Sequence, residues 1–328
     1  MLENSLVNTH KRLMYPALLV VALGLPFIFR GDYSQHILVM TCVFSILTIS
    51  LDIIVGYMGQ ISLGHSAFFG VGAYTSALLS VKLGASVWLG WLAGFILAGV
   101  LGLFVGYVSF RRTRGISLAI ITFGFGLVLW LICTNWFQLT RGWGGLSGIP
   151  CPVLAIPGLI KVPFQSPFSY YYLVLAFLML TVYSVNRLLR CRFGRAIVAL
   201  RENEALARSI GIDALRHYVL GFALGTALAG LAGSAYAHFI GLITPSLLSL
   251  DYLFIMLIML IVGGKGTIPG PIIGAAIFVL VPEWLRMTEE FRPILLGTVF
   301  LVVILFMPHG VYPALLSLWN RVVQFQRR

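Results

Sequence analysis

Polar side chains interrupt an apolar stretch of the sequence between residues 56 and 74. Gln60, Ser62, His65 and Ser66 lie there among five glycines, with long apolar runs on both sides. Amide, hydroxyl and imidazole groups inside a bilayer need hydrogen-bond partners, because lipid offers none. The same groups could bind a polar molecule that crosses the membrane. We therefore regard this stretch as a candidate translocation pathway or gate.

Four ionisable side chains lie in or near the apolar runs: Asp52, His65, His238 and Asp251. Buried charges in lipid are costly and often functional. A local pair or cap and a role in the pathway explain Asp52 equally well. For His65 we favour a hydrogen bond within the glycine-rich turn, for His238 a neutral interfacial site, and for Asp251 a helix N-terminus. Two scattered aspartates leave proton coupling open.

The segment 195–211 predicts one short amphipathic helix outside the membrane. Its alanine, leucine and isoleucine side chains share a face at about 100° per residue, and Gly211 is expected to end it. Such a helix either packs on lipid headgroups or docks in a groove of a cytoplasmic partner. The residues alone leave both open. The charged face carries Arg195, Arg201, Glu202 and Arg208.

No constellation of residues predicts catalysis. The segment 263–267 has a lysine after two glycines, but Met259 stands where a P-loop needs its first glycine, and Gly266 follows the lysine. The four cysteines share no close spacing, so we expect neither a disulfide framework nor a metal site. If transport is driven by ATP, the ATPase must be another chain.

The composition indicates the fold class. The chain has 328 residues, of which 59% are hydrophobic and 10% charged, whereas a soluble domain has about a quarter charged residues. We therefore expect an all-α polytopic membrane protein with glycine-rich, interrupted helices. A net charge of +12 is then typical of basic cytoplasmic loops and does not predict nucleic-acid binding.

Ten apolar runs predict about ten transmembrane helices in a single domain, residues 1–328. The first run follows two basic residues, as in a signal peptide, but more spans follow, which favours an uncleaved helix. The predicted spans are 13–29, 37–56, 65–81, 87–108, 116–137, 170–188, 218–241, 246–263, 267–281 and 291–307.

The distribution of basic residues predicts the orientation. With the N-terminus inside, 16 of the 22 Lys and Arg residues fall on the inner side and six on the outer side. The positive-inside rule then places both termini in the cytoplasm. Segment 138–169 becomes a periplasmic segment that is too polar and proline-rich to span the membrane. Segment 189–217 becomes the sizeable cytoplasmic segment.

Six ordered motifs resemble the LivM-type permeases of branched-chain amino acid ABC importers. The glycine-rich stretch resembles their signature, and residues 194–212 resemble their cytoplasmic coupling segment. The resemblance covers roughly residues 52–311 and departs mildly where Gly266-Thr267 replaces Gly-Ser and Pro308-His309-Gly310 replaces Pro-Arg-Gly. The further matching motifs are Ala229-Gly-Leu-Ala-Gly-Ser-Ala-Tyr-Ala-His, Ile243-Thr-Pro, Gly263-Gly-Lys-Gly-Thr-Ile-Pro-Gly-Pro and Leu305-Phe-Met-Pro-His-Gly.

The resemblance implies a non-catalytic transport subunit in the bacterial inner membrane, without a cofactor of its own. It would pair with a LivH-like permease and with two LivG- and LivF-like ATPases that bind ATP and Mg. A periplasmic binding protein would deliver leucine, isoleucine or valine. Urea, a short amide or another amino acid remains an alternative substrate. A secondary transporter or channel that works alone is the remoter alternative.

The resemblance also gives tasks to the residues of the two segments. ATP binding would push on residues 195–211 and rock the permease between outward and inward access. The charge count places residues 56–64 near the cytoplasmic end, which favours an inner gate, although a re-entrant path to the midplane stays open. The coupling residues would be Arg195, Arg201, Glu202, Glu204, Arg208 and Gly211, and the pathway residues Gln60, Ser62, His65, Ser66, Phe68, Phe69, Asp52 and Asp251.

Overall fold

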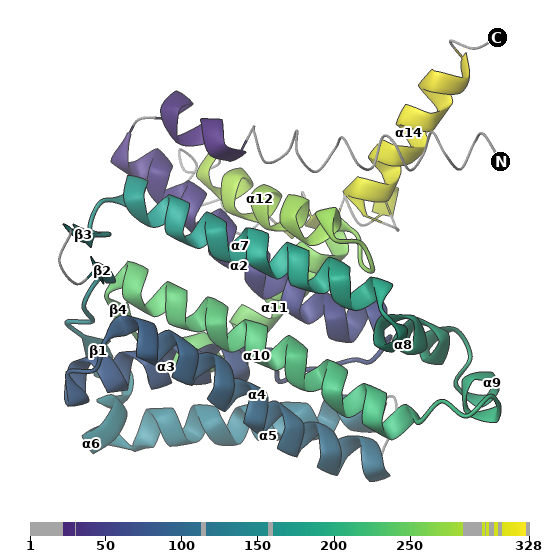
Figure 1. Ribbon diagram of the computed structural model, residues 1–328, viewed down its shortest axis with the longest axis horizontal. Helices are drawn as coiled ribbons and strands as arrows, with labels where there is room; N and C mark the ends of the chain where they lie inside the picture. The colour runs from purple at the N-terminus through teal and green to yellow at the C-terminus, as the bar shows by residue number, and fades with distance from the viewer. Residues whose placement is uncertain are drawn as a thin grey trace.

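The computed structural model describes residues 22–29, 31–112, 116–156, 160–284, 297–298, 300–301, 305–307 and 310–325. Within these residues the protein is an all-α bundle with two small β-sheets. The long helices run roughly side by side, with the strands at one end of the bundle and α8 and α9 at the other (Figure 1). We call these the strand end and the α8–α9 end.

Six helices of the described chain are long and apolar enough to cross a bilayer. Helix α2 continues without interruption into the π-helix η1, so these two elements form one span. The six spanning helices are α2 (Asp32–Asp52) with η1 (Ile53–Tyr57), α3 (His65–Leu83), α4 (Val87–Arg112), α5 (Ile116–Asn135), α7 (Pro167–Arg190) and α10 (Ala214–Ile240).

Shorter elements connect and flank these spans. At the α8–α9 end lie α8 (Arg192–Glu202) and α9 (Glu204–Ser209). Two shorter apolar helices, α11 (Leu250–Gly263) and α12 (Pro269–Trp284), pack on each other and on α2, and α14 (Val311–Phe325) contacts α12. The remaining elements are α6 (Phe137–Thr140), η2 (Gly142–Gly144), β1 (Leu146–Ser147), β2 (Val153–Ile156), β3 (Ile160–Pro163), β4 (Leu242–Ile243) and η3 (Pro245–Leu248).

The prediction of ten spans is supported only in part. Eight predicted spans coincide with the six long helices and the shorter helices α11 and α12. The predicted spans 13–29 and 291–307 lie mostly outside the described residues, although residues 22–28 are helical. The count of ten and the orientation of the termini therefore stay predictions.

Small residues let the central helix α10 approach its neighbours closely. A Cβ atom on Gly72 of α3 would overlap the carbonyl of Gly230 of α10, so glycine is needed at this crossing. The Ser234 hydroxyl lies 3.0 Å from the Gly72 carbonyl oxygen, which links the same two helices. Close approach through small residues is the usual way to pack helices where lipid removes the hydrophobic driving force.

The segment 138–169 folds back onto α10 at the strand end. Strand β1 pairs antiparallel with β4, which directly follows α10, and β2 pairs with β3. The imidazole of His238 donates from Nδ1 to the Pro150 carbonyl at 2.6 Å, so Nε2 accepts from the Ser76 hydroxyl at 2.7 Å. His238 is thus fully buried and fixes the loop, which differs from the expected interfacial site.

Candidate functional site

The second helix changes its winding where the glycine-rich stretch begins. Helix α2 ends at Asp52, and η1 follows as a π-helix whose last residues lead into a turn at Gly59, with φ at +67°. π-Helical turns are rare and are found frequently at functional sites. Here the wider turn delivers the Gly56 carbonyl and the Asp52 side chain to the α8–α9 end of the bundle.

Four residues meet at this point, and we call them the Gly56 junction: Asp52, Gly56, Arg201 and Gly266. Arg201 of α8 donates from Nη1 to the Gly56 carbonyl at 2.6 Å. Asp52 is 1% exposed, and its Oδ1 accepts a hydrogen bond from the Gly266 amide at 2.7 Å. The junction therefore ties α2–η1 to α8 and to the turn between α11 and α12.

Glycine is required at the centre of the junction. A Cβ atom on Gly56 would overlap the Asp52 carboxylate and lie 2.5 Å from the Gly266 amide nitrogen. A Cβ on Gly59 would lie 2.9 Å from Cγ of Arg201. Gly56 and Gly59 thus leave space for the Arg201 side chain and the Asp52 carboxylate. The periodicity of the sequence does not reveal this reason for glycine at the two positions.

The segment 195–211 is two helices, which corrects the prediction of a single one. Helix α8 ends at Glu202, and Asn203 has an extended backbone with φ at −155°. The Asn203 side chain then caps α9 by accepting from the Leu206 amide at 3.0 Å. The predicted helix includes this asparagine, although Asn is a preferred N-cap residue and favours such a break.

The charged side chains of this segment have different surroundings. Glu204 and Arg208 form an i,i+4 ion pair at 2.8 Å on α9, and Arg201 lies 3.9 Å from Glu202. Arg195 is exposed on α8. Gly211 follows α9 with φ at +86°, so its predicted role as a helix stop matches its backbone.

The polar residues after the junction are mostly buried. His65 and Ser62 have no exposed surface, Ser66 is buried, and Gln60 is partly exposed. Because Ser50 donates to the Leu47 carbonyl at 2.6 Å, the contact of 2.8 Å between Ser50 Oγ and His65 Nε2 makes Nε2 the donor. His65 thus bonds α2 and not its own turn, which differs from the expectation.

Two polar atoms at the start of α3 lack a partner. Neither Nδ1 of His65 nor the hydroxyl of Ser62 has a hydrogen-bond partner within the described part of the chain. A buried polar atom without a partner costs about 1–3 kcal/mol. With Nε2 protonated, Nδ1 of His65 is left as an acceptor. Ser66, by contrast, lies 3.3 Å from the Leu248 carbonyl oxygen and is satisfied.

The two predicted pathway phenylalanines pack in the aromatic core. The Phe68 ring lies 5.5 Å from Phe125 and 5.7 Å from Phe222 between centroids. The Phe69 ring lies 5.5 Å from Tyr236. Neither ring has exposed surface, so both position α3 against its neighbours in this conformation.

Asp251 lies apart from the junction. It is exposed in the first turn of α11, as expected for a carboxylate at a helix N-terminus. The other end of this 14-residue helix leads to Gly266, so about 20 Å of helix separates the two regions at 1.5 Å per residue. Asp52 and Asp251 therefore do not form one site.

The sequence patterns did not identify Gly266 as a member of the junction or Ser50 as the partner of His65. Gly266 contributes its backbone amide, and Ser50 contributes the hydroxyl that meets His65. The glycine-rich motif at 263–267 was the available signal that the backbone turns tightly at Gly266, where the structure has φ at +74°. No cluster of three or more His, Cys, Asp or Glu side chains suited to a metal ion occurs in the ranges that the structure covers.

The chain is similar to curated permeases. It is 32% identical over 323 residues to the high-affinity branched-chain amino acid transport system permease protein LivM of Salmonella typhimurium, which covers 92% of this chain and 75% of the relative. It is 26% identical over 299 residues to LivH of the same organism, covering 82% and 90%. The guanosine ABC transporter permease protein NupQ of Bacillus subtilis is 28% identical over 197 residues, covering 56% and 60%.

A family model extends the similarity over most of the chain. The model described as branched-chain amino acid transport system / permease component matches residues 34–307. No solved structure matches the chain. The matched range contains the Gly56 junction, the segment 189–217 and both sheets. The chain therefore belongs to the family of permease components of branched-chain amino acid transport systems.

Proposed function

We propose that this chain is the permease subunit of an ATP-driven importer that moves leucine, isoleucine and valine from the periplasm to the cytoplasm. A LivH-like permease would complete the pathway, two LivG- and LivF-like ATPases would hydrolyse ATP with Mg, and a periplasmic binding protein would deliver the substrate. The single permease domain, residues 1–328, would lie in the bacterial inner membrane with both termini inside.

The hydrogen bond between Arg201 and the Gly56 carbonyl carries this proposal. It connects α8, which lies outside the spans, directly to the point where α2–η1 is interrupted. A push on α8 would therefore be transmitted to the end of a transmembrane helix through a charge-assisted bond of 2.6 Å. Such a connection suits a subunit that receives its work from outside the membrane.

Helix α9 offers an apolar surface to a partner. Leu206 is 63% exposed and Ile210 is 71% exposed, while Ile197 and Leu200 of α8 are buried against the bundle. A helix that presents apolar anchors beyond its own domain suits a groove on another protein. We assign α9 to the contact with the ATPases and α8 to transmission.

The start of α3 supports a pathway for a zwitterion. The N-terminus of a helix favours a carboxylate, and the free acceptor Nδ1 of His65 suits an ammonium group. Ser62 adds a hydroxyl without a partner in the described chain. With the junction near the α8–α9 end, these groups would act at an inner gate that opens when α8 moves.

Reconstituted complexes test the coupling. The Glu204→Gln/Arg208→Gln variant should lower both substrate uptake and the stimulation of ATP hydrolysis by the binding protein. Arg111→Gln, which removes an arginine from the last turn of α4, serves as the matched control. Unchanged uptake and hydrolysis in the double variant would contradict the coupling role.

The relatives also include a permease whose name gives a different substrate. NupQ is a guanosine permease, and the family resemblance also admits urea and short amides. Uptake of labelled leucine should be reduced by isoleucine and valine but not by guanosine or urea at equal concentration. Competition by guanosine or urea instead would assign the chain to that substrate.

A transporter that works alone is the alternative from another class. The purified single chain in liposomes, with an ion gradient and without ATP, should show no uptake of leucine. Uptake under these conditions would contradict the proposal, and the exposed apolar face of α9 would then lack a task.

A further inference from the structure

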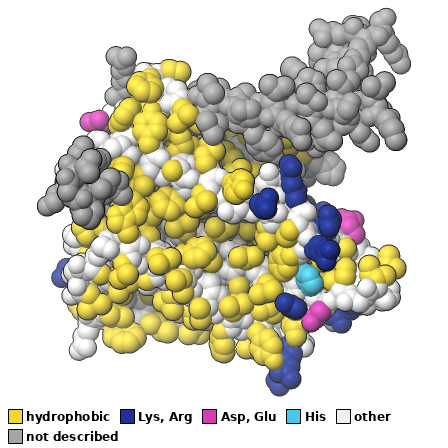
Figure 2. All heavy atoms as spheres, in the orientation of Figure 1, with side chains coloured by type: hydrophobic (Ala, Val, Ile, Leu, Met, Phe, Trp, Pro, Cys, Tyr) yellow, Lys and Arg dark blue, Asp and Glu magenta, His cyan; other side chains and the backbone are white. Residues whose placement is uncertain are grey.

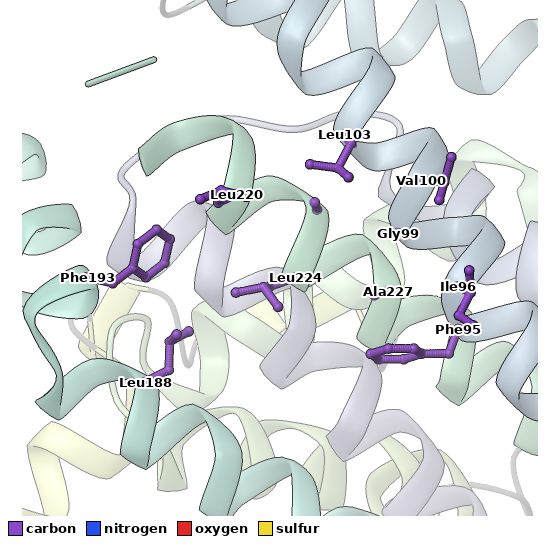
Figure 3. A pocket seen from close by; sticks show the side chains of 11 residues that line it. Phe95, Ile96, Gly99, Val100, Leu103, Leu188, Phe193, Leu220, Leu224 and Ala227 are labelled. Atoms are coloured by element: carbon purple, nitrogen blue, oxygen red, sulfur yellow. The ribbon is translucent and has the colours of Figure 1, made fainter. Parts of the chain in front are cut away.

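An apolar groove and a basic pocket are continuous on one face of the molecule. The groove has a volume of about 420 Å³ and lies between α4 and α10, with the end of α7 at one side (Figure 3). The pocket has a volume of about 790 Å³ and lies between the starts of α8 and α10. Phe193 and Leu220 line both, so they form the boundary between the two.

The groove is built to take an apolar chain. Its walls carry branched and aromatic side chains, including Phe95 and Leu103 of α4 and Leu224 of α10, and its floor is formed by small residues such as Gly99 and Ala227. No charged side chain lines it. It runs along two helices that are apolar enough to span a bilayer, so its occupant faces the hydrocarbon region.

The pocket is built to take a negative charge. Arg192, Arg195 and Arg216 line it, and no ion pair joins any of the three to a carboxylate of the described residues. Its one acidic side chain, Asp213, accepts from the Arg216 amide at 3.2 Å as the cap of α10. Helices α8 and α10 both begin at this pocket, so their dipoles add positive potential.

Two stacked rings lie at the boundary between the groove and the pocket. The Phe193 and His217 rings lie 5.3 Å apart with an angle of 19° between their planes. His217 also donates from Nδ1 to the Asp213 carbonyl at 2.6 Å. Figure 2 shows the Lys and Arg side chains gathered around α8, at the edge of a wide hydrophobic surface.

We propose that this groove and pocket form a binding site for an anionic phospholipid, with an acyl chain along α4 and α10 and the phosphate headgroup among Arg192, Arg195 and Arg216. Basic pockets beside apolar helix surfaces at the membrane boundary recognise acidic headgroups. A bound lipid would lie against α8, the helix whose Arg201 holds the Gly56 carbonyl. The site rests on charge and shape and does not depend on which substrate is carried.

Native mass spectrometry of the full chain tests the site, with phosphatidylglycerol and phosphatidylcholine as probes. The wild-type protein should retain phosphatidylglycerol in preference to phosphatidylcholine. The Arg192→Gln/Arg216→Gln variant should reduce that preference roughly 10- to 30-fold, because it removes two basic side chains that each attract the anionic headgroup. The matched control is Arg187→Gln/Arg190→Gln, which changes the same charge in a neighbouring polar pocket without a groove.

Two further variants separate headgroup recognition from folding. Arg192→Lys/Arg216→Lys keeps the charge and should keep most of the preference. Leu224→Trp fills the groove and should weaken retention of both lipids. The proposal is overturned if the control loses the preference equally, or if the arginine variant retains it. It is also overturned if co-expressed partner permease displaces the lipid and Leu224→Trp prevents assembly, since the groove is then a subunit interface.

Discussion

At the scale of single residues, the two charged side chains of the Gly56 junction form hydrogen bonds with backbone groups. The Asp52 carboxylate meets a backbone amide, and the Arg201 guanidinium meets a backbone carbonyl. Asp52 and Arg201 do not form a direct ion pair with each other. Backbone groups thus meet Oδ1 of Asp52 and the guanidinium of Arg201, whereas Oδ2 of Asp52 has no hydrogen-bond partner in the described part of the chain. The glycines provide the space for this close approach.

Replacement of Gly56 by alanine should destabilise the protein and lower uptake. The added Cβ overlaps the Asp52 carboxylate, and overpacking of this kind costs about 1–3 kcal/mol. Thermal unfolding of the purified chain in detergent measures the effect. Gly124→Ala in α5 is the control, since its Cβ would meet no atom within 4 Å. Equal melting temperatures for the two variants would refute the crowding at the junction.

The Asp52 side chain should contribute to stability more through the hydrogen bond that it accepts than through its negative charge. Asp52→Asn keeps an oxygen for the Gly266 amide and should stay close to the wild type in stability. Asp52→Leu leaves that amide unpaired and should cost about 1–3 kcal/mol. Chemical unfolding in mixed micelles compares the two. If Asn is as harmful as Leu, the negative charge itself is required.

At the scale of elements, the segment 189–217 divides its work between two helices. Helix α8 turns Ile197 and Leu200 to the bundle, whereas Leu206 of α9 and Ile210, the residue after it, point outward. The extended residue Asn203 separates them. Because α9 has only six residues, its stability depends on its cap and on the Glu204–Arg208 pair more than on its length.

Removal of the α9 cap should loosen this helix selectively. Asn203→Ala deletes the bond to the Leu206 amide, a change worth about 1 kcal/mol at an N-cap. Hydrogen exchange should accelerate at residues 204–209 and remain unchanged in α8, and coupling of ATP hydrolysis to uptake should fall. Asn203→Asp keeps the acceptor and is the matched control. Faster exchange throughout α8 as well would show that the two helices are one unit.

At the scale of the whole molecule, the two ends of the bundle differ in their residues. The α8–α9 end carries most of the described arginines, while the strand end carries the loop that His238 fastens to α10. The six spanning helices join these ends. A molecule of this kind can receive a different partner at each end, which fits the proposed importer.

Cysteine labelling in cells should place the two ends on opposite sides of the membrane. In a background without native cysteines, Trp143→Cys should react with an impermeant maleimide from outside, and Leu206→Cys only after permeabilisation. Both positions are more than 60% exposed. Ser62→Cys is fully buried and should be unreactive in this conformation from either side. Reaction of Leu206→Cys in intact cells would reverse the orientation.

Composition and motif order were sufficient for the class of protein. Long continuous apolar runs with few charges indicate membrane helices, because a helix satisfies its own backbone groups where lipid satisfies none. The ordered motifs resembled the family that the comparisons show. Hydrophobic runs also located the long spans, since each run approximates the thickness of a bilayer. These properties depend on local composition and on the order of motifs, so they can be inferred without coordinates.

The tertiary structure decided which residues share a site. The contacts of Asp52 with Gly266 and of Arg201 with Gly56 join positions more than 140 residues apart, and no local pattern encodes such a pairing. The break at Asn203 depends on a cap that competes with a continuous amphipathic pattern. The basic pocket likewise exists only because α8 and α10 begin side by side, which packing and not periodicity brings about.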